Sequence, residues 1–132
     1  MGNSNSAYER WRASALADSG EQIVTVSVGG SVQGQPMTQG TWSQLQRSVR
    51  NALANTVGAI SFATLGNSTW QNVPERSYVA SVLRPDMTQL SALRARLRQL
   101  ADAYGQDAVA LTVGKSVLLG PPAVATSERK AA

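Results

Sequence analysis

The sequence contains no cysteine and no histidine among its 132 residues. Without cysteine, the chain can form neither a disulfide framework nor a thiolate nucleophile. Without histidine, it lacks the most frequent general base and the most frequent metal ligand. Only 8 carboxylates are present, and their spacing matches no zinc, calcium or magnesium motif. The sequence therefore predicts a protein with no metal site and no cofactor.

Long apolar runs are also absent from the sequence. No stretch approaches the roughly 20 apolar residues that a membrane-spanning helix needs. The first residues lack the basic start and the apolar centre of a signal peptide. We therefore expect a cytoplasmic protein without a transmembrane segment. Residues 2–6 fit the N-myristoylation pattern, and a flexible polar tail is the simpler interpretation.

Hydrophobic periodicity divides the remaining chain into helices and strands. The expected helices cover residues 7–19, 41–56 and 85–104, and the expected strands cover residues 22–28, 59–65, 76–83 and 108–119. Leucines recur at helical spacing from Leu90 to Leu100 and give the strongest pattern. Valines alternate with polar residues from Val24 to Val28, as in a half-buried strand. Thr41 and Gln44 are interpreted as a capping box for the second helix.

The order of these elements predicts the fold class. After the first helix, the order is strand, helix, strand, strand, helix, strand, which indicates an α+β, ferredoxin-like βαββαβ plait. Right-handed connections then place two helices on one face of a four-stranded antiparallel sheet. The extra N-terminal helix belongs to the same single domain, which we expect over residues 7–120. Residues 1–6 and 121–132 are expected to be flexible tails.

The sheet face opposite the helices is expected to carry small, uncharged side chains. Larger side chains, such as Phe62, Val79 and Leu83, are assigned to the helix side. The opposite face then carries Thr25, Ser27, Ser61, Ala63, Tyr78, Ala80, Val82, Ala110 and Thr112. A face exposed to water normally carries charges. We therefore expect this face to be covered by a second copy, a ligand or the N-terminal helix.

Residues 66–75, between the second and third strands, form a long connector for a hairpin. Either the strands extend into this segment or it projects as a loop. Trp70 within it is interpreted as a core plug rather than a contact residue, because large aromatic side chains gain most from burial.

Several short runs resemble a family of small bacterial proteins of unknown function. These runs are Thr41-Trp42, Trp70, residues 77–86 and residues 104–109. Members of that family combine a Trp-bearing first helix, a strand that ends in a Pro-Asp helix start, and an aromatic-Gly-Gln turn before the last strand. The resemblance covers about Val24 to Leu119 and implies a plait. It implies no activity and no catalytic residue.

These features favour a non-catalytic protein that self-associates and binds a protein or small-ligand partner. A phage or mobile-element origin would suit such a compact, basic chain, with its net charge of +4 from 12 basic and 8 acidic side chains. The positive bias permits an anionic partner without requiring one.

Two alternatives remain open. The first is a nucleic-acid-binding protein that contacts phosphates through helix arginines, namely Arg47, Arg50, Arg94 and Arg98. A solvated helix surface explains the same arginines more simply, and the signature aromatic residues of RNA-recognition modules are missing. The second is a cofactor-free enzyme that uses Tyr78, a buried arginine and water in a pocket beside the N-terminal helix. Acid–base mechanisms usually draw on histidine or paired carboxylates, so no residue spacing selects a catalytic site.

Overall fold

The structure, a computed structural model, describes residues 21–117 and 119–121. The expected N-terminal helix over residues 7–19 and nearly all of both expected tails lie outside the described residues. The chain divides into two units, residues 22–114 and the two terminal segments on either side of them. The fold and the sites below belong to the unit of residues 22–114.

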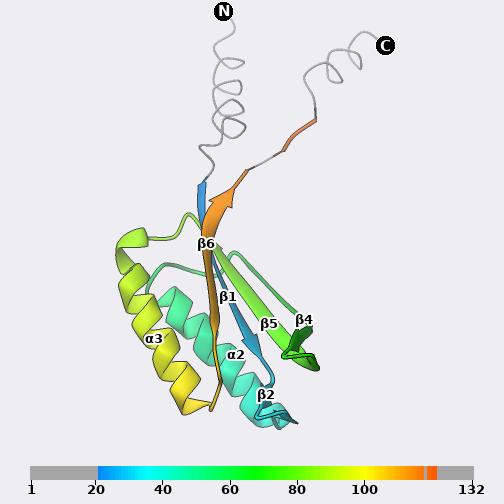
Figure 1. Ribbon diagram of the computed structural model, residues 1–132. Coiled ribbons are helices and arrows are strands. Elements are labelled where there is room, and N and C mark those ends of the chain that lie inside the picture. The colour runs from blue at the N-terminus through cyan, green and yellow to red at the C-terminus, as the bar shows by residue number, and fades with distance from the viewer. Residues whose placement is uncertain (1–20, 118, 122–132) are drawn as a thin grey trace, which may run out of the picture. The chain divides into compact units, whose positions relative to one another are not determined.

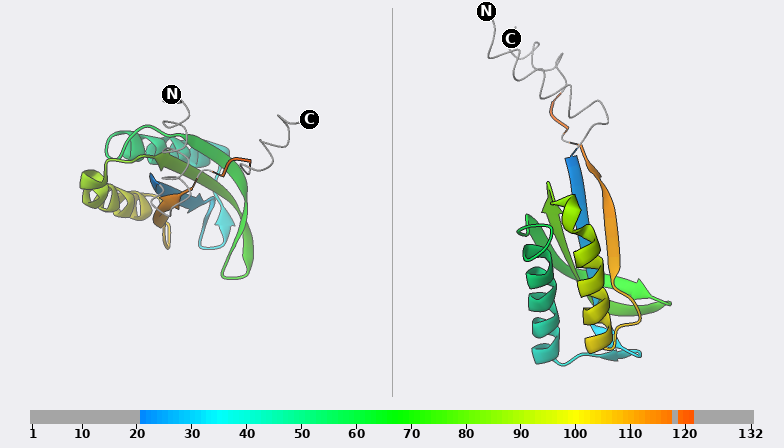
Figure 2. Two further views of the ribbon diagram at one scale, coloured as in Figure 1. Left: turned by 90° about the horizontal axis from the view of Figure 1, so that it is seen from above. Right: turned by 90° about the vertical axis from the view of Figure 1, so that its left-hand side faces the viewer.

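Two helices cover one face of a four-stranded antiparallel sheet (Figures 1 and 2). The strands of this sheet are β1 (Glu21–Gly29), β4 (Phe62–Trp70), β5 (Val73–Leu83) and β6 (Ala110–Ser116). The helices are α2 (Gln39–Ala54) and α3 (Leu90–Ala103), and the short 3-10 helix η1 (Met87–Gln89) precedes α3. This arrangement confirms the expected α+β class.

The strand order is β4-β5-β1-β6, so β1 and β5 are central and β4 and β6 form the edges. A separate two-stranded sheet pairs β2 (Ser31–Val32) with β3 (Gln35–Pro36) directly after β1. The turn between these short strands has positive φ at Gln33 and Gly34. The short extended strands bring the chain from the end of β1 to the start of α2.

The antiparallel register of β1 and β5 determines which side chains enter the core. Directly opposed residues point to the same face of a sheet, and alternate residues point to opposite faces. Six side chains from the two strands face the helices, and each is at most 2% exposed: Val24, Val26 and Val28 oppose Val82, Ala80 and Tyr78. Burying one Val side chain contributes roughly 1.5 to 3 kcal/mol, so this pairing supplies much of the sheet's share of the core.

The helices complete the core with apolar stripes. On α2, the buried side chains recur at helical spacing: Trp42, Leu45, Val49, Ala52 and Leu53. On α3, the buried side chains are Leu93, Leu97 and Leu100. The cap of α2 differs from the prediction, because the Thr38 side chain accepts the hydrogen bond from the Thr41 amide and the helix begins earlier. Thr41 therefore occupies the first helical turn.

The expected face assignment is wrong for β5 and for part of β4. Tyr78, Ala80 and Val82 lie in the core, whereas their neighbour Val79 points to the opposite face. Phe62 opposes Ser81 on that opposite face and is 53% exposed. The error arose because side-chain size was used to choose the phase of each strand. Pairing with β1, and not side-chain volume, determines that phase.

The connector between the expected second and third strands consists of two strand extensions. β4 and β5 pair from Phe62 and Ser81 out to Trp70 and Val73, and only Gln71 and Asn72 remain as the loop. Both loop residues have positive φ, as in the type I′ turn of a two-residue hairpin. Because β1 pairs with β5 only as far as Ser77, the rest of the hairpin extends past the end of β1. It bends toward the side opposite the helices (Figure 2).

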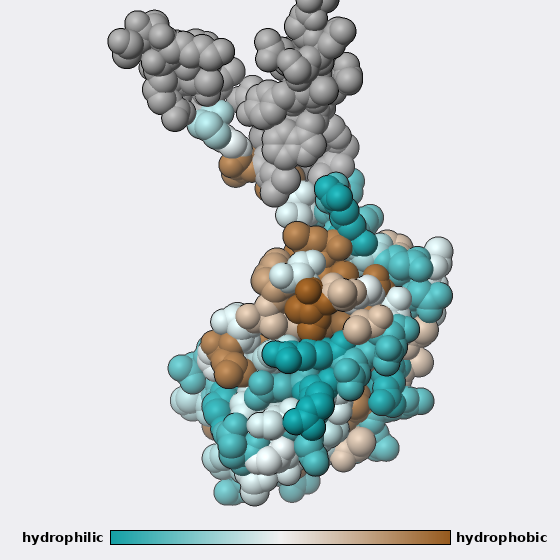
Figure 3. All heavy atoms as spheres, turned by 180° about the vertical axis from the view of Figure 1, so that it is seen from behind, coloured by the Kyte–Doolittle hydropathy of each residue, from teal (hydrophilic) through white to brown (hydrophobic). Residues whose placement is uncertain are grey.

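Edge strand β4 leaves apolar side chains in solvent. Every residue from Phe62 to Trp70 is exposed, with Leu65 at 61%. A space-filling view from behind shows a group of apolar side chains in the upper middle of this face, with hydrophilic residues below it (Figure 3). The described surface of this unit therefore carries apolar area that its own helices do not cover.

The corrected strand phase gives a stability prediction. Ala80 is 0% exposed, so Ala80→Glu forces a charge into the core and should lower the free energy of unfolding by more than about 3 kcal/mol. Thr64→Glu is the matched control on an exposed position of neighbouring β4 and should change it by less than about 0.5 kcal/mol. Urea denaturation followed by circular dichroism measures both. Equal unfolding midpoints for the two variants would contradict the register described here.

Candidate functional site

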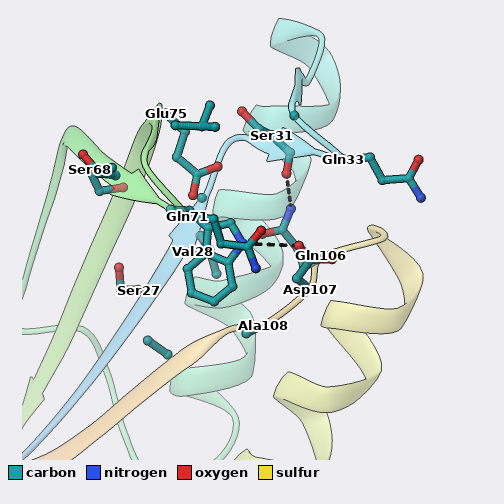
Figure 4. A pocket seen from close by; sticks show the side chains of 16 residues that line it. Ser27, Val28, Ser31, Gln33, Ser68, Gln71, Glu75, Gln106, Asp107 and Ala108 are labelled. Atoms are coloured by element: carbon teal, nitrogen blue, oxygen red, sulfur yellow. Dashed lines mark hydrogen bonds between the residues drawn. The ribbon is translucent and has the colours of Figure 1, made fainter.

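A cavity of about 350 Å³ lies at the end of the sheet where the β4–β5 hairpin extends past β1 (Figure 4). Its walls come from the end of β1, the β2–β3 turn, the hairpin and the turn that joins α3 to β6. This volume falls at the lower end of the roughly 300 to 1,000 Å³ that is usual for small-molecule pockets. Segments far apart in the sequence therefore enclose a space large enough for a small ligand.

Two hydrogen bonds connect the α3–β6 turn to the other walls. The indole Nε1 of Trp70 donates to Asp107 Oδ2 at 3.2 Å. The Gln106 side-chain Nε2 donates to the backbone carbonyl of Ser31 at 3.1 Å. Gly105, with φ of 65°, ends α3 in the left-handed region and directs the next two residues into the cavity. The expected core plug Trp70 is instead a wall residue, 45% exposed.

Glu75 enters the cavity from β5 because Gly29 leaves space for its carboxylate. A methyl group built on Gly29 would overlap the Glu75 carboxylate. The glycine at residue 29 therefore allows the Glu75 side chain to adopt this orientation. Glu75 is half-buried, and it points into the cavity from the hairpin, opposite the turn that carries Gln106 and Asp107 (Figure 4).

Arg76, the next residue, anchors the base of the hairpin to the start of α2. Its Nη1 donates to Gln39 Oε1 at 3.1 Å, and its Nη2 donates to the Met37 carbonyl at 2.9 Å. Its guanidinium also lies over the Trp42 ring, 5.3 Å from the centroid, a cation–π contact. The hairpin thus leaves the sheet from a fixed base.

The charges around the cavity are opposite in sign to those of the chain as a whole. Among the described residues, Glu75 and Asp107 line it and no lysine or arginine does, although the net charge of the chain is +4. The other polar lining groups are serine and threonine hydroxyls, backbone groups and glutamine amides. Carboxylates and the π face of an indole both attract cations. The cavity therefore suits a cationic ligand with hydroxyl groups and a flat ring.

The expected face residues that lie outside the core occupy different parts of the sheet. Ser27 and Ala110 line the cavity. Thr25 lies on the same face as Ser27, with its hydroxyl 2.8 Å from the Ser81 hydroxyl, and Thr112 follows Ala110 on that face of β6. Ser61 accepts a hydrogen bond from the Leu83 amide, while Ala63 opposes the core residue Ala80 from exposed β4.

The expected arginine residues do not form one stripe. Arg50 Nε donates to the hydroxyl of Tyr78 at 3.0 Å, beside β5. Arg94 and Arg98 line a groove with β6, and β1 separates β5 from β6 in the sheet. Arg47 is exposed on α2. The anion-binding role of these arginines stays a prediction, divided between two flanks of the helical layer.

Sequence reasoning missed Glu75 and Asp107 as site residues. Both residues lie beside strands that the sequence predicts. Glu75 directly precedes the expected third strand, and Asp107 directly precedes the expected fourth strand. Their common site depends on the bend of the hairpin, which the sequence pattern does not reveal. No group of three or more acidic side chains in the described part of the chain is arranged to hold a metal ion. Of the helices in that part, none is long and apolar enough to cross a membrane.

Comparison with known proteins shows a likeness of fold. The chain resembles the structure of a phage SAM lyase in complex with S-methyl-5′-thioadenosine, with a TM-score of 0.51 and 16% identity over 73% of this chain and 81% of that one. A phage SAM lyase in its apo state gives a TM-score of 0.49 at 17% identity, with the same coverage. No family model and no curated protein matches the sequence. The expected resemblance to an uncharacterised bacterial family thus stays without support.

This finding corrects the main functional expectation. A non-catalytic association protein is contradicted, since the similar fold is that of an enzyme. Of the alternatives drawn from the sequence, the cofactor-free enzyme is the one that the finding favours. At 16% identity, the likeness concerns the fold.

The hydrogen bond between Trp70 and Asp107 can be tested directly. Asp107→Ala removes the acceptor, so the indole N–H resonance of Trp70 should move upfield in a ¹⁵N–¹H correlation spectrum, because a hydrogen bond deshields the donated proton. The resonance of Trp42 should stay in place. Asp102→Ala, an exposed acid of α3 outside the cavity, is the control and should move neither signal. An unchanged Trp70 resonance in Asp107→Ala would contradict the contact.

Proposed function

We propose that this protein is an enzyme that cleaves S-adenosylmethionine and releases S-methyl-5′-thioadenosine. The observation that carries the proposal is the cavity lined by Glu75, Asp107 and Trp70, with no basic side chain among its described lining residues. The likeness of fold to a phage SAM lyase with S-methyl-5′-thioadenosine bound supports the same substrate. We further propose that the fold is a ferredoxin-like plait, which the strand order β4-β5-β1-β6 supports.

The substrate matches the cavity group by group. Its sulfonium carries a positive charge, which a carboxylate about 4 Å away stabilises by roughly 1 kcal/mol in bulk water and about 4 kcal/mol near a protein surface. Its ribose hydroxyls can donate hydrogen bonds to the Glu75 or Asp107 carboxylate. Its adenine is a flat ring that can stack on Trp70. The product lacks the sulfonium charge, so the same carboxylates favour the substrate over the product.

The reaction needs few catalytic groups on the protein, because the positively charged sulfonium already makes the thioether a good leaving group. The bond between sulfur and the four-carbon amino-acid portion breaks, and its electron pair remains on sulfur as a neutral thioether. The carbon left behind can bond to the substrate's own carboxylate oxygen, which closes a lactone ring without any base. Alternatively, the neighbouring carbon loses a proton to Glu75 or Asp107, which leaves an alkene. The first route suits a chain without histidine.

The activity assay is incubation of the full chain with S-adenosylmethionine and detection of S-methyl-5′-thioadenosine by mass spectrometry. Glu75→Gln keeps the size of the side chain and removes its charge, so kcat/KM should fall at least about tenfold, which corresponds to 1.4 kcal/mol. Asp102→Asn makes the same change outside the cavity and should retain the activity. The wild-type co-product, lactone or alkene, identifies the route. Absence of the thioether from the wild-type reaction would overturn the proposal.

We also propose that the enzyme self-associates, as the sequence predicts, with β4 as the contact surface. Its support is the exposure of large apolar side chains on both faces of this edge strand. Phe62, which opposes Ser81, is 53% exposed, and Leu65, which opposes Tyr78 on the other face, is 61% exposed. An exposed apolar edge strand can pair with another chain.

Light scattering after size exclusion tests this surface. The wild-type mass should be a multiple of the chain mass at both low and high salt, because apolar contacts are not screened by salt. Phe62→Arg with Leu65→Arg should reduce it to a single chain. Asn55→Arg, on the exposed end of α2, is the control and should leave the mass unchanged. A wild-type monomer at every concentration would refute self-association.

A further inference from the structure

A second hollow lies on the helix side of the sheet, between α3 and edge strand β6. Its volume is about 590 Å³. Aliphatic side chains of Leu97, Val109, Leu111 and Val113 form its surface, and Val113 is 39% exposed. It shares Asp107 and Ala108 with the cavity described above, and its other lining residues are different. We call it the α3–β6 groove.

Two arginine residues stand along the α3 side of this groove. Arg94 and Arg98 are four residues apart, so they lie on the same side of the helix, roughly 5 to 6 Å apart at their Cβ atoms. Neither has a hydrogen bond or ion pair with any residue in 21–117 or 119–121. Two like charges at this spacing destabilise a helix by about 0.2 to 0.5 kcal/mol. An anion placed between them would remove this repulsion and accept hydrogen bonds from both guanidinium groups.

The other side of the groove is the free edge of the sheet. β6 pairs on one side with β1, and no other strand of the described chain pairs with its outer side. An edge strand presents backbone N–H and carbonyl groups that can pair with an added strand. The outer side of β6 is therefore open to an added strand as far as the described residues go.

We propose that the α3–β6 groove binds an extended acidic segment of a partner protein by strand addition. The segment's backbone pairs with β6 from Ala110 to Gly114. Side chains at alternate positions of the segment enter the groove, where apolar ones lie on its aliphatic surface and an acidic one meets Arg94 and Arg98. Asp107, at the end of the groove next to the α3–β6 turn, carries the opposite charge and disfavours an acid at that end. The proposal does not depend on the activity proposed above.

Charge decides between this occupant and a second copy of the chain. Two copies that paired through β6 would bring two sets of Arg94 and Arg98 toward one seam, where like charges repel. A basic or neutral segment would leave both arginines without a counter-charge. Nucleic acid would satisfy the arginines through its phosphates, but it would leave the aliphatic floor and the strand edge unused. An acidic peptide can contact the arginines and the aliphatic side chains, and it can also pair with the edge of β6.

The test is an NMR titration of the full ¹⁵N-labelled chain with the peptide acetyl-Val-Thr-Glu-Thr-Val-Thr-amide, in which both valines and the glutamate share one face of a strand. The amide resonances of residues 110–114 should shift, and a version with lysine at the acidic position should bind at least about tenfold more weakly. Arg94→Ala with Arg98→Ala should weaken binding of the acidic peptide by at least about tenfold. Arg47→Ala with Arg96→Ala is the matched control of equal charge and should bind as the wild type does, because neither of those residues lines the groove.

A second probe separates strand addition from simple charge attraction. The same acidic peptide with alternate backbone amides N-methylated keeps its charge, but it cannot complete the ladder with β6. It should bind at least about tenfold more weakly than the unmodified peptide. Equal binding of the methylated peptide, equal binding of the lysine peptide, or the absence of shifts in β6 would each overturn the proposal. Because both peptide comparisons use the wild-type chain, a variant that failed to fold would not affect them.

Discussion

The pairing of β1 with β5 is the constraint on which the rest of this structure depends. It places Val24, Val26 and Val28 opposite Val82, Ala80 and Tyr78, and both helices pack on the face that these six side chains form. A shift by one residue would turn every one of them away from the helices. The register therefore decides at once what is core and what remains on the face opposite the helices.

The same register creates the candidate site. β5 is longer than β1 and continues past Ser77, so the distal part of the β4–β5 hairpin has no neighbour in the sheet on that side. It is held at its base by Arg76, which contacts Gln39, Met37 and Trp42, and near its tip by the bond from Trp70 to Asp107. Between these two attachments lies the cavity, into which Gly29 admits the carboxylate of Glu75.

The cavity and the α3–β6 groove meet at the α3–β6 turn and carry opposite charges. In the part of the chain that the structure describes, the cavity on one side has two carboxylates and no basic side chain. The groove on the other side has two arginines beside aliphatic side chains. A cationic sulfonium and an acidic peptide are therefore suited to different sides of the turn. Asp107 lines both hollows.

The sequence by itself determined the elements and most of the helical core. The stripe from Trp42 to Leu53 and the leucines of α3 follow from helical periodicity, because a helix offers one consistent apolar face. Strand phase was another matter, since β5 is apolar on both faces, and only pairing with β1 decided that Tyr78, Ala80 and Val82 are buried. The candidate site could not be predicted from the sequence for a related reason. Glu75 and Asp107 lie 32 positions apart, and they line one cavity only because the tertiary structure bends a hairpin toward a turn.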